Sequence, residues 1–211
     1  MIELHPGSGP LHVVGLAAHP DDLEIACGGT LIRLSGRPGA TASFLTMTGT
    51  QDREAEARRA ASEVWPGADA RFARLPDGRL PQHWGAVKDA LHAFADACPA
   101  PDLVLAPRSD DAHQDHRLIG ELVTTVWRDA VVLHYEIPKW DGDLGRTSAY
   151  VPLDEETVQR KLEILDACYP SQVHHDWWDH ATFEGLMRMR GVECRSRFAE
   201  AFALHKAVLG L

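Results

Sequence analysis

Two kinds of hydrophobic pattern alternate along the first two thirds of the chain. Short, nearly continuous apolar runs, typical of buried strands, occur at 11–18, 40–48, 70–75, 102–107 and 131–137. Between them, apolar residues recur as on one face of a helix at 23–34, 52–65, 85–97 and 116–129. Short apolar runs suit buried strands, and the longer periodic segments suit helices, so the pattern predicts a regular succession of strand and helix.

Strands that alternate with helices are joined by right-handed crossovers, which leave the strands parallel in one sheet. We therefore predict an α/β fold: a Rossmann-like, mostly parallel sheet with helices on both faces, in a single domain spanning residues 1–211. The polar segments AHPDD (18–22), TMTGT (46–50) and PRSDDAHQDH (107–116) each follow a predicted strand. They should meet at the carboxyl edge of the sheet, where such folds bind ligands.

The pattern weakens beyond residue 138. A helix is predicted over 154–169, and the tail 197–209 fits either a helix or a strand. The segment HHDWWDHATFEG (174–185) is rich in aromatic residues and histidine. Its tryptophans, Trp177 and Trp178, suit core packing, a subunit contact or stacking on a sugar ring. Its histidines are better explained as surface residues than as a second metal site.

Composition narrows the classes of function. The 211 residues carry a net charge of −10, which argues against a nucleic-acid-binding surface. The four cysteines are scattered, as in reduced cytosolic proteins. No signal-like segment begins the chain and no apolar run is long enough to span a membrane, so we expect a cytoplasmic location. The 12 histidines keep a metal or proton-transfer role in view.

The first and third polar segments together contain the residues of a hydrolytic metal site. Such a zinc site has three protein ligands and one position open for water. His19, Asp22 and His116 offer two nitrogens and one oxygen for it. Asp21 is adjacent to a ligand but points differently, which suits a base that takes a proton from the water.

Two further residues of the third segment complete this hypothesis. His113 lies three positions before His116, so at a helix start both can face one side. It would stabilise the oxyanion and protonate the leaving nitrogen. Asp115 could orient a histidine. The plain alternative for AHPDD is a helix start capped by aspartate, with proline in the first turn.

These motifs closely resemble those of the PIG-L/LmbE-like zinc N-deacetylases. The resemblance is carried by AHPDDLE with CGGTL, HQDH about a hundred residues later, TMTG, Arg53-x-x-Glu56, LPDGRL, ACYPSQV (167–173) and FAEAF (198–202). Two features depart from the family pattern without touching the expected chemistry: Gln114 stands where proline is common, and Trp65-Pro66 replaces a usual Leu-Gly.

The resemblance implies a Rossmann-like fold, zinc ligands at His19, Asp22 and His116, a general base at Asp21 and an assisting histidine at His113. It also places Arg53 against polar groups of the substrate. The alternative role for Arg53 is an ion pair with Glu56 on the helix surface.

We therefore expect a zinc-dependent hydrolase that removes an N-acetyl (acyl) group from an N-acetylated amino sugar or glycoconjugate. Iron(II) is the alternative metal in the cell. The expected partner is this small molecule, with no nucleic acid or membrane, and a homo-oligomer is left open. One alternative is a metallo-β-lactamase-like hydrolase, because HQDH matches half of HxHxDH, although Asp111 stands where that pattern has histidine. Another is a noncatalytic sugar-binding relative, which would have no need of Asp21.

Overall fold

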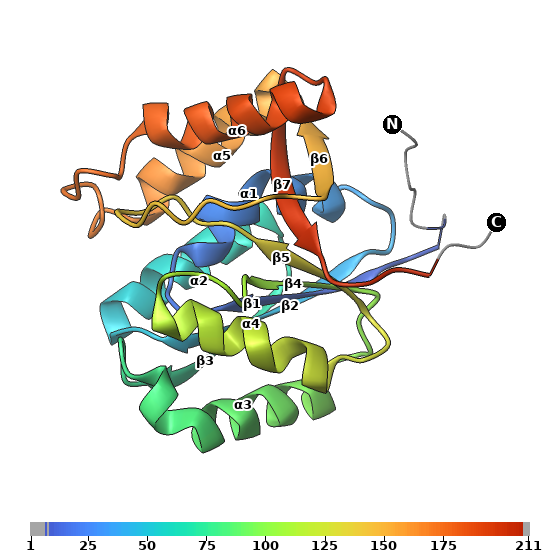
Figure 1. The fold of residues 1–211 in the computed structure, drawn as a ribbon, viewed down its shortest axis with the longest axis vertical. Helices are drawn as coiled ribbons and strands as arrows, with labels where there is room; N and C mark the ends of the chain where they lie inside the picture. The colour runs from blue at the N-terminus through green and yellow to red at the C-terminus, as the bar shows by residue number, and fades with distance from the viewer. Residues whose placement is uncertain (1–6, 8, 209–211) are drawn as a thin grey trace.

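The described part of the chain forms one sheet of seven strands with helices on both faces (Figure 1). The computed structural model describes residue 7 and residues 9–208. Within them the strand order is β3-β2-β1-β4-β5-β7-β6. The first five strands in this order are parallel, and β7 runs antiparallel to both β5 and β6. The α/β fold class predicted from the alternation is confirmed.

Every element predicted before residue 138 is present close to its expected bounds. The strands are β1 (His12–Ala17), β2 (Thr41–Thr48), β3 (Asp69–Leu75), β4 (Leu103–Pro107), β5 (Val131–Tyr135), β6 (Ala149–Leu153) and β7 (Phe198–Leu204). The helices are α1 (Asp22–Ser35), α2 (Gln51–Val64), α3 (Trp84–Ala97), α4 (Gln114–Val126), α5 (Glu155–Cys168) and α6 (His180–Cys194). A short 3-10 helix, η1 (Leu80–His83), precedes α3.

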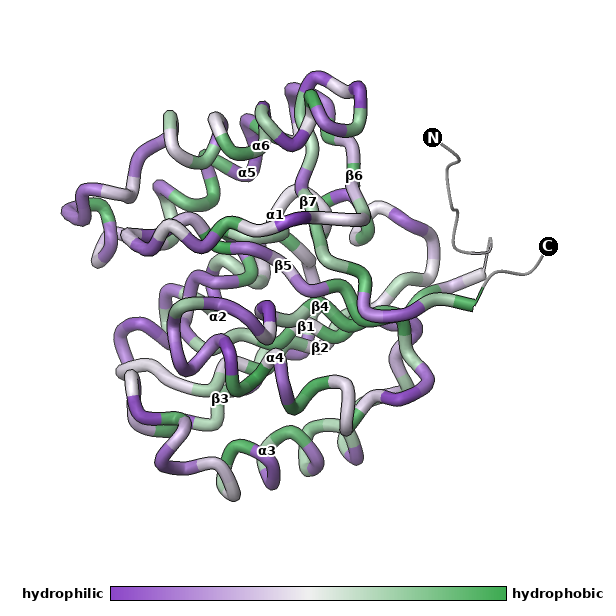
Figure 2. Tube along the Cα trace, viewed as in Figure 1, coloured by the Kyte–Doolittle hydropathy of each residue, from purple (hydrophilic) through white to green (hydrophobic). Residues whose placement is uncertain are grey.

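The central strands are buried on both sides by two separate cores. Val13 and Ala17 of β1 pack with the apolar residues of α1, α2, α5 and α6, whereas Val14 and Leu16 pack with those of α3 and α4. Figure 2 shows hydrophobic colouring along β1, β2 and β4 in the middle of the fold. A strand covered on both faces is apolar at every position, which explains the continuous apolar runs.

The last third of the chain contains two elements that the pattern does not predict, β6 and α6, and the tail is the strand β7. Strand β6 lies at the edge of the sheet, is mostly half-exposed and contains Pro152. The buried face of α6 consists of Phe183, Met187, Arg190 and Gly191. This spacing is helical, but two of its four positions are not strongly apolar, so the periodicity is hidden.

A buried ion pair fills a break in α1, the helix that starts at the polar segment AHPDD. The break lies at Cys27, whose φ and ψ are −140° and 22°. Lys161 Nζ donates to the carbonyl of Ile25 at 2.7 Å, and Glu200 accepts the N–H groups of residues 29 and 30 at 2.9 and 2.6 Å. Lys161 Nζ and Glu200 Oε1 are 2.7 Å apart. The C-terminal third of the chain thus satisfies backbone groups that the helix itself leaves unpaired.

The outermost residues of the chain, 1–6, 8 and 209–211, are outside the described part. The expectation of no N-terminal signal segment and the outer bounds of the 1–211 domain fall partly on these residues. Among the residues that are described, no helix combines the length and the apolar character that a membrane crossing requires.

Candidate active site

The three expected metal ligands meet at the carboxyl edge of the sheet. His19 lies in the β1–α1 loop, Asp22 begins α1 and His116 lies in the first turn of α4. His19 Nδ1 is 3.0 Å from His116 Nε2 and 3.6 Å from Asp22 Oδ1. Asp22 Oδ2 is 3.4 Å from His116 Nε2, and it accepts the N–H groups of Ala18 and His19 at 2.8 and 2.9 Å. The Asp22 carboxylate is therefore fixed against both rings.

The outer nitrogen of each of these histidines faces a carboxylate. His19 Nε2 is 3.1 Å from Asp77 Oδ1, and His116 Nδ1 is 3.1 Å from Asp111 Oδ2. A neutral imidazole that donates from one nitrogen presents a lone pair at the other. Without a metal, one proton shared between these two nitrogens accounts for their 3.0 Å separation; with both rings neutral and donating outward, the two lone pairs face one point, where a cation can bind. A tetrahedral ion with Zn–N bonds of about 2.0–2.1 Å separates its ligand atoms by about 3.3 Å, so the residues present fit a metal ion.

The surrounding carboxylates favour positive charge at this point. Burial opposes protonation of His116, but Asp22 and Asp111 outweigh it and raise the pKa of His116 to about 9. Burial also opposes the charge of His19, whose pKa is nevertheless raised well above its usual value by Asp22 and two further aspartates. Burial opposes the charge of Asp22, while the two histidines hold its pKa well below the usual range. A bound divalent ion would replace these protons.

Asp21, the expected base, is buried and paired with Arg53. Arg53 Nη2 lies 2.9 Å from Asp21 Oδ2 and 3.3 Å from the carbonyl oxygen of Pro20. Burial raises the pKa of Asp21 to about 6, against the opposing charge of Arg53. Arg53 Nε is also 3.6 Å from Glu56 Oε2. The ion pair with Glu56 is therefore present, and the same guanidinium holds the carboxylate of Asp21.

His113 lies beside the two histidines of the cluster but makes a different bond. Its ring centroid is 4.8 Å from that of His19 and 4.9 Å from that of His116. One nitrogen of each of the three rings lies within 4.8 Å of the others, so His113 is also within reach of a shared ion. However, its Nδ1 accepts the N–H of Asp115 at 3.3 Å. The neutral ring then carries its proton on Nε2, which favours a hydrogen-bond donor over a ligand.

Asp115 anchors a neighbouring loop to the cluster. Its side chain is fully buried, and its two oxygens accept the N–H groups of residues 78 and 80 at 2.8 and 3.0 Å. Asp115 Oδ2 is also 3.7 Å from His19 Nε2. Its strongest bonds are thus to the loop that carries Asp77, the carboxylate on His19.

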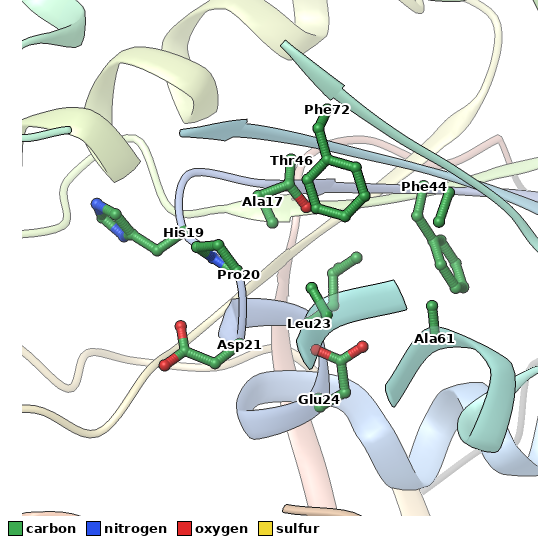
Figure 3. A pocket seen from close by; sticks show the side chains of 12 residues that line it. Ala17, His19, Pro20, Asp21, Leu23, Glu24, Phe44, Thr46, Ala61 and Phe72 are labelled. Carbon is green, nitrogen blue, oxygen red and sulfur yellow. The ribbon is translucent and has the colours of Figure 1, made fainter. Parts of the chain in front are cut away.

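A small pocket lies behind the cluster, between the start of α1 and strands β1 to β3 (Figure 3). His19 and Asp21 extend to one side of the β1–α1 loop, and the rings of Phe44 and Phe72 lie on the sheet side. The pocket holds no more than a water-sized group, because a single water already needs about 10–15 Å³ of accessible volume.

Sequence reasoning missed the carboxylates that orient the two histidines, Asp77 and Asp111. It also missed Lys139, whose Nζ lies 3.1 Å from Asp111 Oδ1. Asp77 belongs to LPDGRL and Asp111 to PRSDDAHQDH, two segments that the sequence did single out. The signal that could have found them is general: a metal-bound histidine nearly always donates its other N–H to a carboxylate or carbonyl.

The histidines of the aromatic segment stay outside the cluster. His180 Nε2 pairs with Asp166 Oδ2 at 2.8 Å. Among the described residues, no group of three closely spaced metal-binding side chains contains His174, His175 or His180.

Fold and site together define an α/β protein with a candidate metal centre of two histidines and an aspartate at the carboxyl ends of parallel strands. The sequence profile of the family described as PIG-L: GlcNAc-PI de-N-acetylase matches residues 14–127, more than half of the 211-residue chain and the whole of this centre. The chain belongs to the PIG-L family.

Solved structures share the complete fold. The conserved protein TT1542 from Thermus thermophilus is 24% identical, with a TM-score of 0.73 over 95% of this chain and 97% of that one. The N,N'-diacetylchitobiose deacetylase from Pyrococcus horikoshii is 17% identical, with a TM-score of 0.67 over 92% and 83%. GalB, the 4-carboxy-2-hydroxymuconate hydratase from Pseudomonas putida KT2440, is 16% identical, with a TM-score of 0.74 over 95% and 98%. Because the fold hosts both deacetylases and a hydratase, the activity must be argued from the site.

Proposed function

We propose that the chain is a metal-dependent N-deacetylase that hydrolyses the acetamide of an N-acetylated amino sugar or glycoconjugate. The observation that carries this proposal is the approach of His19 Nδ1 and His116 Nε2 to 3.0 Å beside the carboxylate of Asp22. Membership of a de-N-acetylase family supports the reaction type.

In this proposal His19, Asp22 and His116 hold the metal, with zinc as the expected ion and iron(II) as the alternative. When bound, a divalent ion at such a site lowers the pKa of a water molecule at its open position to about 7. Asp77 and Asp111 keep the two rings in the tautomer that binds metal, because each faces the outer nitrogen of one ring at 3.1 Å.

The protein side chains then divide the proton transfers of amide hydrolysis. Asp21 takes the proton of the attacking water, and the guanidinium of Arg53 holds its carboxylate in place at 2.9 Å. The Nε2–H of the neutral His113 ring donates a hydrogen bond to the carbonyl oxygen as that oxygen gains charge. The proton that Asp21 has taken then passes to the leaving nitrogen, because a neutral imidazole that gave up its own proton would become an imidazolate. The C–N bond breaks, and the products are acetate and a free amine.

Two features favour this function over the alternatives. A metallo-β-lactamase-like site would need a nitrogen ligand at position 111, where Asp111 instead bonds the outer nitrogen of His116. A noncatalytic sugar-binding protein would have no need to bury Asp21 beside the expected ligands and pair it with Arg53. The deacetylase named among the structural neighbours acts on an N-acetylated sugar, which supports the same substrate class here.

A panel assay tests the proposal. Purified protein is loaded with zinc or iron(II), and its turnover is compared on four classes of substrate. Release of free amine is measured from N-acetylglucosamine derivatives and an N-acetylated peptide, ring opening from a β-lactam, and release of the alcohol from a phosphodiester. We expect about one metal ion per chain, turnover on the N-acetyl sugars first, loss of turnover with a chelator and its return with metal. Full turnover in a verified metal-free sample would contradict the mechanism, and a better β-lactam substrate would favour the alternative.

A further inference from the structure

Two loops beyond the candidate centre are bonded to it from different sides. The first is the segment 139–143, between β5 and β6. Lys139 Nζ contacts Asp111 Oδ1 at 3.1 Å, and Asp143 accepts the N–H of residue 112 at 2.7 Å. These bonds hold the segment against the loop that carries His113 and leads into α4.

The second is the segment 169–179, between α5 and α6. The N–H and hydroxyl of Ser171 donate to the Glu56 carboxylate at 3.0 and 2.6 Å. Glu56 lies 3.6 Å from Arg53, which contacts Asp21 at 2.9 Å. This segment is therefore fixed to the side of the centre that holds the expected base.

Aromatic rings from the two segments meet. Trp140 is 71% exposed, and its ring centroid lies 6.1 Å from that of Trp177 and 5.7 Å from that of His175. The rings of His175 and Trp177 are stacked, 5.9 Å apart with an interplanar angle of 9°. Figure 1 shows both segments at the edge of the molecule where α1 and α4 begin. We call Trp140, His175 and Trp177 the aromatic rim.

We propose that the aromatic rim is a sugar-binding subsite in which Trp140 stacks against a pyranose ring linked to the amino sugar that is deacetylated. This inference rests on the proposed function and deepens it, because it assigns the substrate as a glycoside of at least two rings. The pocket behind the centre is too small for a sugar ring. The two segments that carry the rim are bonded to Asp111 and to Glu56, so a second ring of the substrate can reach the rim from the centre.

The chemistry of the rim favours a sugar over an aromatic group. The C–H groups on one face of a pyranose carry slight positive charge and pack against the negative face of an indole. The hydroxyl groups around the ring need polar partners, and Asp141, His174 and Asp176 are exposed beside the rim. An aromatic group would instead be bound best between apolar walls, whereas Trp140 offers a single exposed platform with polar neighbours.

Substitution of Trp140 tests the subsite without touching the centre. Trp140→Ala, Trp140→Phe and the control Met189→Ala, an exposed apolar residue of α6 that is 58% exposed, are compared in the metal-loaded protein. Calorimetry gives the Kd of glucosamine and of its β-1,4-linked disaccharide, which are the deacetylated products and cannot react further. Kinetics give KM and kcat for the corresponding N-acetylated sugars.

We expect Trp140→Ala to raise the Kd and the KM of the disaccharide about three- to tenfold, the range of a lost aromatic stacking contact. The kcat of Trp140→Ala should stay within about twofold, and its Kd and KM for the monosaccharide should not change. Trp140→Phe should raise the Kd and KM of the disaccharide less than Trp140→Ala does. Met189→Ala should match the unsubstituted protein.

Equal effects on monosaccharide and disaccharide, or no effect on either, would overturn the subsite while leaving the deacetylase proposal intact. Dissociation of a dimer by Trp140→Ala in sedimentation, with unchanged Kd values, would also overturn it and assign the rim to a contact between copies. If the unsubstituted protein hydrolyses no N-acetyl sugar, the proposed function fails, but the Kd values of the products still decide the subsite.

Discussion

Arg53 Nη2 lies 2.9 Å from Asp21 Oδ2, and Arg53 Nε lies 3.6 Å from Glu56 Oε2. Glu56 in turn accepts both the N–H and the hydroxyl of Ser171. One guanidinium therefore links the expected base to the segment that follows α5. Because it holds the Asp21 carboxylate directly, its main effect should be on turnover.

Replacing Arg53 with alanine should lower kcat about 10- to 100-fold, since displacement of a reacting group by about 1 Å can cost that much. Metal content and KM should change little. Arg58→Ala is the matched control, because Arg58 lies on the same helix and pairs with Glu54 at 2.8 Å. Steady-state kinetics and metal analysis test this. A rise in KM alone would instead identify Arg53 as a substrate-binding residue.

Loss of the bond between Asp111 and His116 should weaken metal binding. Asp111→Asn removes the charged acceptor 3.1 Å from His116 Nδ1, and loss of such a partner typically weakens metal binding about 10- to 100-fold. Competition with a chromogenic chelator measures the zinc Kd. Asp110→Asn is the control, because that neighbour is exposed and pairs with Arg108. Equal zinc affinity in both variants would show that Asp111 does not orient the ring.

The sequence predicts those elements whose burial is visible in the hydrophobic pattern of their own residues. Strands β1, β2 and β4 are covered on both faces, and in β1 and β4 the apolar run is nearly continuous. In α6, Arg190 occupies a buried position because Glu136, far away in sequence, binds it through two contacts of 2.7 Å. Because the partner of Arg190 lies far away in the sequence, the residues of α6 alone do not show a helical pattern of apolar positions. The helix is therefore not predicted.

The candidate site divides in the same way. Topology alone brings His19, Asp22 and His116 to one edge, and the structure places their polar atoms within 3.0 to 3.6 Å of one another. The partners of the outer nitrogens, Asp77 and Asp111, depend on how three loops pack, which no spacing rule specifies. The roles of the site residues stay predictions, and the variants described here test them.

The buried pair that fills the break in α1 should be important for stability. Glu200→Gln leaves the ammonium of Lys161 buried without its counter-ion, and such a loss typically costs about 3–5 kcal/mol. The double variant Glu200→Gln, Lys161→Met should lose less than the sum of the single variants, because no unpaired charge remains. Urea denaturation measures the free energy of unfolding of the single variants and of the double variant.

The control for this pair is Glu63→Gln, which removes the exposed ion pair with Arg160. Exposed pairs contribute about 0–1 kcal/mol, so the change in the free energy of unfolding should be small. Equal losses in Glu200→Gln and Glu63→Gln would contradict the assigned role of the buried pair.

Asp21 and Asp22 are adjacent and buried, and their asparagine variants should fail for different reasons. Asp21 Oδ2 contacts Arg53, whereas Asp22 lies against both His19 and His116. Asp21→Asn should keep the metal and the fold but lose about 100- to 10,000-fold in kcat, since the water has no proton acceptor. Substrate affinity should change little.

Asp22→Asn instead removes the only anionic residue among the three expected ligands, so metal affinity itself should fall. The lost carboxylate also accepts two backbone N–H groups, which the amide oxygen of asparagine can still accept, so the loop should keep its shape. Excess zinc should then partly restore turnover in Asp22→Asn and leave Asp21→Asn inactive. Metal content and turnover against zinc concentration, measured for both variants, separate the two roles. Rescue of Asp21→Asn by zinc, with Asp22→Asn fully metallated and inactive, would show that the two aspartates have exchanged places in the mechanism.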